Sequence, residues 1–298
     1  MICIIAGPTA IGKTKVAIET AKKINGEVIS ADSMQIYKGF NIGTAKPTTE
    51  EMEGIPHHLI SITEPHENFS AGEFVFRTNV LIKEIIKNGK IPIIAGGTGF
   101  YVNALMTGVD VSETIGEENL KRDEFMKMAE EKGAEYIHSI LQKKDPEYAA
   151  LTHFNNVKRV ARALGYIEVN NQTFTSYNEC LKKRQTDEKY RLFKLSLPRD
   201  VLYERINSRT EKMYEDGLVN EVKGLLGSGV DKTLAPMNGI GYKEVVKYLD
   251  GFYSLDEAIE KTKQATRNYA KRQETWFNNK MDGIKIDVRN LTNCIIPF

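Results

Sequence analysis

Cysteine is scarce in this chain, and the sequence also lacks the marks of a secreted or membrane protein. Its 298 residues include 3 cysteines, which form no Cys-x-x-Cys pair and have no histidine pair nearby. That spacing argues against both a zinc site and a disulfide framework. There is neither a long apolar run nor a cleavable signal at the start, so we expect a cytoplasmic protein with no membrane partner.

An excess of positive charge is also missing. The 41 Lys and Arg residues are almost balanced by 40 Asp and Glu residues, which leaves a formal net charge of +1. This excludes a surface that attracts polyanions everywhere, so any nucleic-acid site must gather its positive charge locally. The length suits one large domain or two moderate ones, and we expect a monomer with no obligate protein partner.

Apolar runs alternate with helical spacing in the first third of the chain. Unbroken apolar runs at 1–6 and 91–95 are typical of buried parallel strands, and 27–31 is expected to be another strand. Segments 15–25 and 71–87 have helical spacing, and Gly26 is expected to end the first helix. This pattern predicts an α/β fold with a doubly wound parallel sheet, whose site lies beyond the carboxyl ends of the strands. Further strands are expected at 59–62, 193–197 and 284–288.

The composition changes after residue 112. Charged residues dominate there and strand-like apolar runs disappear. This predicts a helical insertion domain at 113–186, set into a core that consists of 1–112 and 187–298.

A phosphate-binding loop follows the first expected strand and opens the first expected helix. It reads Gly7-Pro8-Thr9-Ala10-Ile11-Gly12-Lys13-Thr14, which fits the P-loop pattern in its required context. The backbone amides and the helix N-terminus attract a polyphosphate, Lys13 adds a full charge, and Thr14 offers its hydroxyl to Mg²⁺. The motif predicts a diphosphate or triphosphate ligand with Mg²⁺, and taken alone it favours ATP.

Two further polar segments end neighbouring strands in the same crevice. Asp32 follows the strand at 27–31, where its carboxylate can bind a metal, take a proton or cap the next turn. Thr98 follows Gly96 and Gly97, and its hydroxyl can donate to an oxygen of a departing diphosphate. The sequence leaves these roles open.

Together these segments resemble the tRNA dimethylallyltransferase family, also called tRNA isopentenyltransferases, of the bacterial type. The resemblance covers nearly the whole chain in the expected order, and it is more specific than the P-loop. Its motifs are GPTAIGKT (7–14), ADSMQIYKGFNIGTAKP (31–47), HHL (57–59), GGTGFY (96–101), KRVARAL (158–164), NGIGYKE (238–244) and ATRNYAKRQETWF (265–277).

The resemblance implies transfer of a dimethylallyl group from dimethylallyl diphosphate to the exocyclic N6 amine of the adenine on the 3′ side of a tRNA anticodon. Asp32 is then the general base, while Thr98 and Lys13 assist the departing diphosphate. The partner is the anticodon stem-loop, which the insertion domain contacts. The implied tRNA-binding residues are Asp32, Ser33, Met34, Gln35, Thr98, Arg122, Lys158, Arg159, Val160, Ala161, Arg162, Asn238, Gly239, Ile240, Gly241, Tyr242 and Lys243.

Three positions depart from the family pattern. Ile11 replaces a small or polar residue, Asn238 replaces a common Gln, and Met34 replaces a frequent Arg. None of them supplies the essential amides, charge or hydroxyl, so we expect altered packing or affinity. A separate expectation is a basic stripe formed by Lys263, Arg267 and Lys271, which are spaced by four residues on one helix, with Arg272 beside the last.

Three other functions stay open. A P-loop kinase would share the fold and use Asp32 as a base toward a hydroxyl. A nucleotide-gated RNA-binding protein would perform no chemistry. A prenyltransferase acting on free adenine nucleotides would use the same donor, but the matches at 158–164 and 238–243 argue against it.

Overall fold

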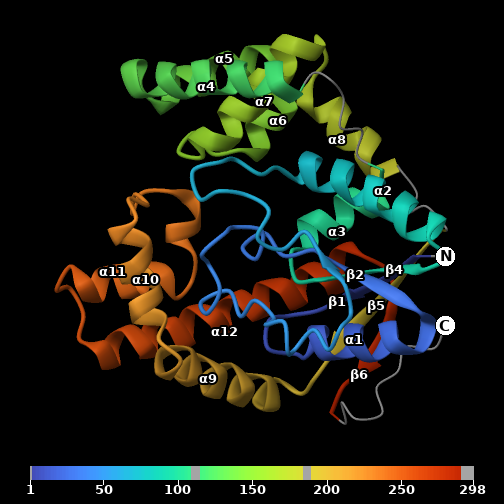
Figure 1. Ribbon diagram of the computed structural model, residues 1–298. Coiled ribbons are helices and arrows are strands. Elements are labelled where there is room, and N and C mark those ends of the chain that lie inside the picture. Colours follow the sequence, from blue (N-terminus) through green and yellow to red (C-terminus); the bar gives the residue numbers. More distant parts are fainter. Residues whose placement is uncertain (1, 109–114, 184–188, 290–298) are drawn as a thin grey trace. The chain divides into compact units, whose positions relative to one another are not determined.

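The chain forms two compact units. The computed structural model describes residues 2–108, 115–183 and 189–289. One unit consists of Met1–Met106 with Glu188–Phe298, and the other consists of Thr107–Asp187. The sequence-based division placed the insertion at 113–186. Figure 1 labels the helices and strands of both units.

A six-stranded parallel sheet organises the first unit, as the apolar runs predicted. The strand order is β3-β2-β4-β1-β5-β6, and every neighbouring pair is parallel. Ala6 pairs with Gly96 and Ser30 pairs with Ala95, so β1, β2 and β4 end at the same edge. The strands are β1 (Ile2–Ala6), β2 (Gly26–Ser30), β3 (His57–His58), β4 (Ile91–Gly96), β5 (Tyr190–Ser196) and β6 (Ile284–Asp287).

Helices bury this sheet. Cys3 and Ile5 of β1 pack with residues from α1, α9 and α12, while Ile4 between them is also fully buried. A strand without an exposed face explains the unbroken apolar run at the start of the sequence. Figure 1 shows the long α12 running beside α9. The helices of this unit are α1 (Lys13–Ile24), α2 (Ala71–Lys87), α3 (Gly99–Met106), α9 (Arg199–Glu215), α10 (Leu218–Gly227), the 3₁₀ helix η1 (Ala235–Asn238), α11 (Tyr242–Leu249) and α12 (Leu255–Lys280).

The second unit is helical throughout its described residues. Its core is separate from that of the sheet and includes Phe125, Leu141, Leu164 and Phe174. Because α7 buries one face in this core, its charged residues lie on the opposite face. The helices are α4 (Ile115–Lys132), α5 (Ala134–Lys144), α6 (Pro146–Leu151), α7 (Val157–Asn170) and α8 (Phe174–Lys183).

Two local predictions are wrong. Segment 59–62 is not a strand, because Leu59 and Ser61 have positive φ angles of 59° and 53° that an extended chain does not adopt. Gly26 does not end α1: Asn25 does so in the left-handed conformation, and Gly26 is the first residue of β2. Gly26 is needed there for space, since a Cβ would lie 2.8 Å from Ile93 Cδ1.

No helix among the described residues is both long and apolar enough to cross a membrane.

Candidate active site

The P-loop joins the end of β1 to the start of α1, as predicted. Gly12 adopts a left-handed conformation with φ of 99° directly before α1, and Ala10 has φ of 62°. Ile11 is fully buried, so this departure from the family pattern serves the packing of the loop. Lys13 folds back over the loop, and its Nζ donates a hydrogen bond of 2.8 Å to the Pro8 carbonyl oxygen.

Lys13 lies in a charged and poorly solvated place. Burial, opposed by nearby Asp32 and aided by Arg209, lowers the pKa of its ammonium group to about 8. Burial also lowers the pKa of Arg209, whereas Asp32 raises it. Burial makes the charged forms of Lys13 and Arg209 unfavourable. An anion that binds beside these two cations stabilises their charged forms.

Asp32 organises the turn that follows β2. Its Oδ1 accepts hydrogen bonds from the Met34 amide (2.9 Å) and the Gln35 amide (3.4 Å). The turn-capping role is therefore real, and it occupies only one carboxylate oxygen. Among the residues that the structure describes, none donates a hydrogen bond to Oδ2.

Thr98 connects the loop that follows β4 to the Asp32 turn. The Ser33 amide donates to Thr98 Oγ1 at 3.0 Å, and Thr98 Oγ1 donates to Ser33 Oγ at 3.3 Å. The Thr98 amide also donates to the Ala31 carbonyl at 3.2 Å. Gly96 makes this approach possible, because a Cβ there would lie 2.1 Å from the Ala31 oxygen. The two strand ends are thus locked together.

A cavity of about 390 Å³ lies among these loops and the helices opposite them. It brings together the P-loop, the Asp32 turn and the 238–243 segment, which are far apart in the sequence. Polar and charged groups from six segments therefore converge on one space. Its lining residues are Thr9, Ala10, Asp32, Ser33, Met34, Gly43, Thr44, Ile206, Arg209, Thr210, Met213, Asn238, Gly239, Ile240, Lys243, Thr262, Thr266, Tyr269 and Arg272.

Sequence reasoning gave no individual role to Arg209 or Tyr269 in the helical wall of this cavity, whereas it placed Arg272 in the expected basic stripe. Arg209 comes from α9, and Tyr269 and Arg272 come from α12. Arg209 had one usable signal, because Ile206 and Met213 place it on the inward face of its helix at spacings of three and four. Arg272 lies over the Tyr269 ring, with 5.7 Å from Cζ to the ring centroid.

The expected basic stripe on α12 holds only in part, because Lys271 and Arg272 are exposed while Lys263 and Arg267 are engaged by neighbouring side chains. Lys263 is only 11% exposed at its side chain and pairs with Glu211 (2.7 Å) and Glu260 (2.6 Å). Arg267 donates a hydrogen bond of 2.6 Å to Asn207 Oδ1. Helical spacing placed these residues on one face, but Lys263 and Arg267 contact α9 through Glu211 and Asn207.

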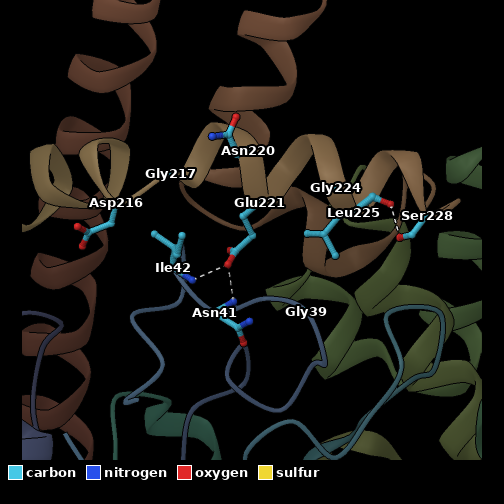
Figure 2. A pocket seen from close by; sticks show the side chains of 10 residues that line it. All are labelled: Gly39, Asn41, Ile42, Asp216, Gly217, Asn220, Glu221, Gly224, Leu225 and Ser228. Atoms are coloured by element: carbon cyan, nitrogen blue, oxygen red, sulfur yellow. Dashed lines mark hydrogen bonds between the residues drawn. The ribbon is translucent and has the colours of Figure 1, made fainter. Parts of the chain in front are cut away.

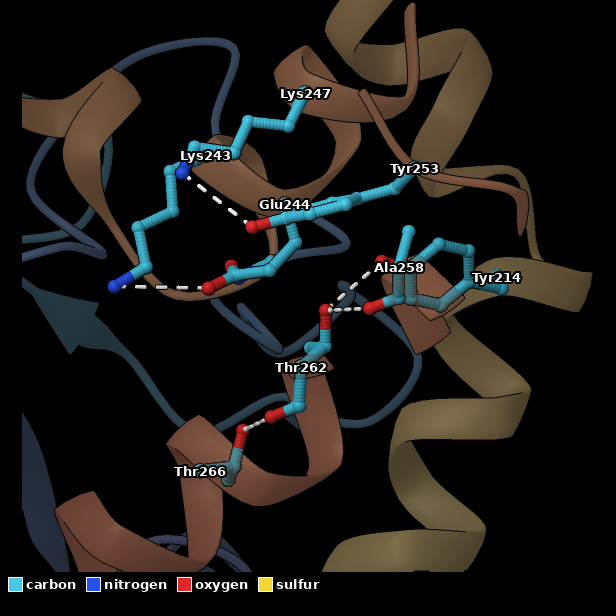
Figure 3. Close-up of polar contacts among 9 residues, drawn as sticks. Tyr214, Lys243, Glu244, Lys247, Tyr253, Ala258, Thr262 and Thr266 are labelled. Atoms are coloured by element: carbon cyan, nitrogen blue, oxygen red, sulfur yellow. Dashed lines mark hydrogen bonds and ion pairs between the residues drawn. The ribbon is translucent and has the colours of Figure 1, made fainter. Parts of the chain in front are cut away.

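Most of the 238–243 segment lines the cavity, whereas Gly241 and Tyr242 do not. Gly241 has φ of 92° and starts α11, where its amide donates to Glu244 Oε2 at 2.7 Å. Figure 3 shows the buried Glu244 beside Lys243, with Thr262 bonded to Tyr214 nearby. The side chain of Tyr242 is fully buried, so any tRNA contact at this position falls to its backbone or its neighbours.

Glu221 on α10 links the 41–43 loop to Tyr242 at the start of α11. Its carboxylate accepts hydrogen bonds from the amides of Asn41 (3.1 Å), Ile42 (2.8 Å) and Gly43 (3.3 Å). It also accepts one of 2.6 Å from the Tyr242 hydroxyl. Figure 2 shows Glu221 reaching the 41–42 backbone at the edge of a second, open pocket of about 470 Å³.

The other expected tRNA contacts differ in their surroundings. Gln35 turns inward, where its Nε2 donates to the carbonyls of Thr44 (3.3 Å) and Ala45 (3.2 Å). Met34 lies on the cavity wall against Gly239. In the second unit Lys158, Arg159 and Arg162 are exposed, Val160 and Ala161 are buried, and Arg122 bonds to Asn119 and Asp123.

The residues present suit a magnesium ion that is held mainly by the phosphate groups of a bound substrate. No group of three or more His, Cys, Asp or Glu side chains able to hold a metal occurs among the described residues. Mg²⁺ commonly keeps several waters and binds through one or two protein oxygens plus substrate phosphates. Thr14 is exposed in the first turn of α1, so a site made of its hydroxyl and the oxygens of a bound phosphate fits.

Comparison with known proteins agrees with this geometry. A family model described as IPP transferase matches residues 35–280. A tRNA dimethylallyltransferase from Acetivibrio thermocellus is 48% identical over 93% of this chain and 88% of its own length. One from Bacillus cereus is 45% identical over 96% of this chain and 90% of its own length.

Solved structures give the same result. The full-length tRNA isopentenylpyrophosphate transferase from Bacillus halodurans is 43% identical, covers 96% of this chain and 89% of its own, and has a TM-score of 0.70. A eukaryotic dimethylallyltransferase acting on tRNA is 30% identical, covers 98% of this chain and 75% of its own, and has a TM-score of 0.85. The chain belongs to the tRNA dimethylallyltransferase family.

Proposed function

We propose that this protein transfers a dimethylallyl group from dimethylallyl diphosphate to the N6 amine of the adenine on the 3′ side of a tRNA anticodon. Diphosphate is the second product, and the reaction takes place in the cytoplasm. One observation carries the proposal: a single cavity is lined by Asp32, by P-loop residues and by Arg209. Such a cavity offers a base to the attacking amine and an anion site to the leaving group of one displacement reaction.

The P-loop side of the cavity suits the departing diphosphate. Cleavage of an allylic carbon–oxygen bond builds negative charge on the leaving group, and fixed cations and amides stabilise that charge. Lys13 and Arg209 influence each other's charge, so an anion between them relieves their repulsion. Lys13 must leave the Pro8 carbonyl to reach the ligand, which exchanges one hydrogen bond for another.

Asp32 suits the amine. The lone pair of an exocyclic adenine amine is delocalised into the ring, so removal of its proton during attack helps. A carboxylate within hydrogen-bond reach contributes roughly 10²–10⁴ in rate to such a step. Because the turn amides occupy Oδ1, the side chain is held still while Oδ2 stays able to accept the proton.

Magnesium would be held by the Thr14 hydroxyl together with the diphosphate. When bound, it offsets part of the negative charge that the diphosphate acquires on leaving. The Thr98 hydroxyl donates its one hydrogen to Ser33 Oγ, and it would turn that hydrogen to a diphosphate oxygen when the donor binds.

The tRNA side requires the target base to leave its stack, at a cost of a few kcal/mol. Asn238, Ile240 and Lys243 line the cavity and can contact the extruded nucleotide. The exposed Lys158, Arg159 and Arg162 on α7 provide local positive charge for tRNA phosphates despite the neutral total. We assign the anticodon stem-loop to these two groups of residues.

The test is a product analysis with competing substrates. The protein is incubated with dimethylallyl diphosphate, Mg²⁺ and either unmodified tRNA or AMP, and the nucleosides are identified by mass spectrometry after digestion. We expect prenylated adenosine from tRNA only. Prenylated AMP would indicate the free-nucleotide enzyme, and ATP hydrolysis with no prenyl transfer would overturn the proposal.

A further inference from the structure

Gln273 on α12 bridges two loops of the site that are far apart in the sequence. Its Oε1 accepts a hydrogen bond of 2.9 Å from the Thr9 amide in the P-loop. Its Nε2 donates one of 2.8 Å to the Gly97 carbonyl oxygen, directly before Thr98. The side chain is 6% exposed, so water does not replace either bond readily.

The surroundings leave little room for another arrangement. A Cβ on Gly97 would lie 2.4 Å from Gln273 Nε2, and a Cβ on Gly99 would lie 2.2 Å from the Trp276 ring. The loop from Gly97 to Gly99 is therefore pressed against one face of α12. Gln273 and Trp276 are three residues apart and lie on that face together.

We propose that Gln273 is a positioning residue, which fixes the spacing between the P-loop and the Gly97–Thr98 loop and thereby sets the affinity for the diphosphate end of the donor. This inference rests on the proposed function, because it assigns both loops to the diphosphate. Gln273 acts through Thr9 and Gly97 and does not touch the ligand.

A primary amide is the side chain that meets both demands. One end must accept from a backbone N–H while the other end donates to a backbone carbonyl, and a carboxylamide has one group of each kind. Methionine of similar length would leave the Thr9 amide and the Gly97 carbonyl buried without partners. Ionised glutamate would keep the first bond and direct a second acceptor at the carbonyl of Gly97.

The Thr9 bond also has a consequence for the P-loop itself. Thr9 lines the cavity, yet its amide hydrogen is already engaged by Gln273. The remaining loop amides and Lys13 must therefore hold the phosphate, and the Gln273 bond keeps Thr9 from turning away. Loss of the bond frees the loop to adopt conformations that bind diphosphate poorly.

The experiment compares Gln273→Met and Gln273→Glu with Gln264→Met, a control at an exposed position of the same helix. Calorimetry with inorganic diphosphate and Mg²⁺ gives the anion affinity, and steady-state kinetics give kcat and the KM values for donor and tRNA. Thermal unfolding checks that each variant folds. If Gln273→Met does not fold, Gln273→Glu carries the test because it keeps the size and the Oε1 acceptor.

We expect the Kd for diphosphate and the KM for the donor to rise about tenfold or more in both Gln273 variants, because a buried hydrogen-bonded pair is broken. The KM for tRNA should stay within about twofold, and Gln264→Met should match the wild type. A purely structural role would lower stability and the active fraction while leaving the diphosphate Kd unchanged, and that outcome would overturn the proposal. Failure of the proposed function looks different, since the wild type itself would then transfer no prenyl group.

Discussion

Replacing Glu221 with glutamine should lower the free energy of unfolding by about 2 kcal/mol and loosen one wall of the cavity. Glu221 is the point where the 41–43 loop, α10 and the start of α11 meet, through three backbone amides and the Tyr242 hydroxyl. Gly43 and Thr44, next to these amides, line the cavity. The change therefore tests how the site is supported from outside.

The magnitude follows from the individual bonds. Hydrogen bonds to a charged group contribute roughly 1.5–3 kcal/mol each, and less of this is forfeited when water can enter. In Glu221→Gln the amide nitrogen takes the place of Oε1. The remaining oxygen still accepts from the amides of Asn41 and Ile42, and the Tyr242 hydroxyl can turn to accept from the new amide nitrogen. The Gly43 amide loses its partner, although its bond of 3.3 Å is the longest. Loss of the charge and of one weak bond gives the value of about 2 kcal/mol.

Glu221→Ala removes all four hydrogen bonds and should lower the free energy of unfolding by about 4 kcal/mol. Water from the open pocket beside Glu221 reaches only part of this backbone, so it replaces only some of the lost bonds. Urea unfolding of the wild type, Glu221→Gln, Glu221→Ala and the exposed control Glu215→Gln gives the differences. Both Glu221 variants should also raise the KM for tRNA. If Glu221→Ala is as stable as the control, the supporting role assigned to this carboxylate is incorrect.

Two other predictions concern charge. Lys13, with its pKa near 8, is charged below about pH 8 and loses that charge as the pH rises through this value, so the binding of inorganic diphosphate should weaken from about pH 7 to about pH 9. Lys13→Met removes this dependence, and equal slopes in both proteins would contradict it. Replacing Lys158, Arg159 and Arg162 together with alanine should reduce the slope of log affinity for tRNA against log salt by about 0.7–0.9 for each phosphate that is no longer neutralised. A slope equal to that of the wild type would show that the tRNA binds elsewhere.

Local patterns in the sequence predicted the elements that local forces determine. The helix expected at 71–87 matches α2 at both ends, because Ser70 caps it and its apolar residues recur at helical spacing. The parallel sheet and the P-loop followed from unbroken apolar runs and from one compact motif. The strand expected at 59–62 failed because Leu59 and Ser61 turn the chain, and neither residue type signals a positive φ.

The residues that sequence reasoning missed depend on long-range packing. Arg209, Glu221 and Gln273 lie on helices whose faces are selected by the fold. Gln273 falls within the 265–277 motif, but the motif alone does not separate it from the polar residues beside it. The same cause explains the error at Lys263, which helical spacing placed in solvent and the fold placed between two glutamates. Pairs that are distant in the sequence leave no periodic signal in a single chain.

The most direct test of the account is the turnover of Asp32→Asn. Asparagine keeps an Oδ1 that can accept from the amides of Met34 and Gln35, so the turn should survive while the proton acceptor is removed. We expect kcat for prenyl transfer to fall by about 10²–10⁴, with the Kd for tRNA and for diphosphate within a few fold of the wild type. A variant that turns over at the wild-type rate would contradict the central claim that Asp32 receives the amine proton.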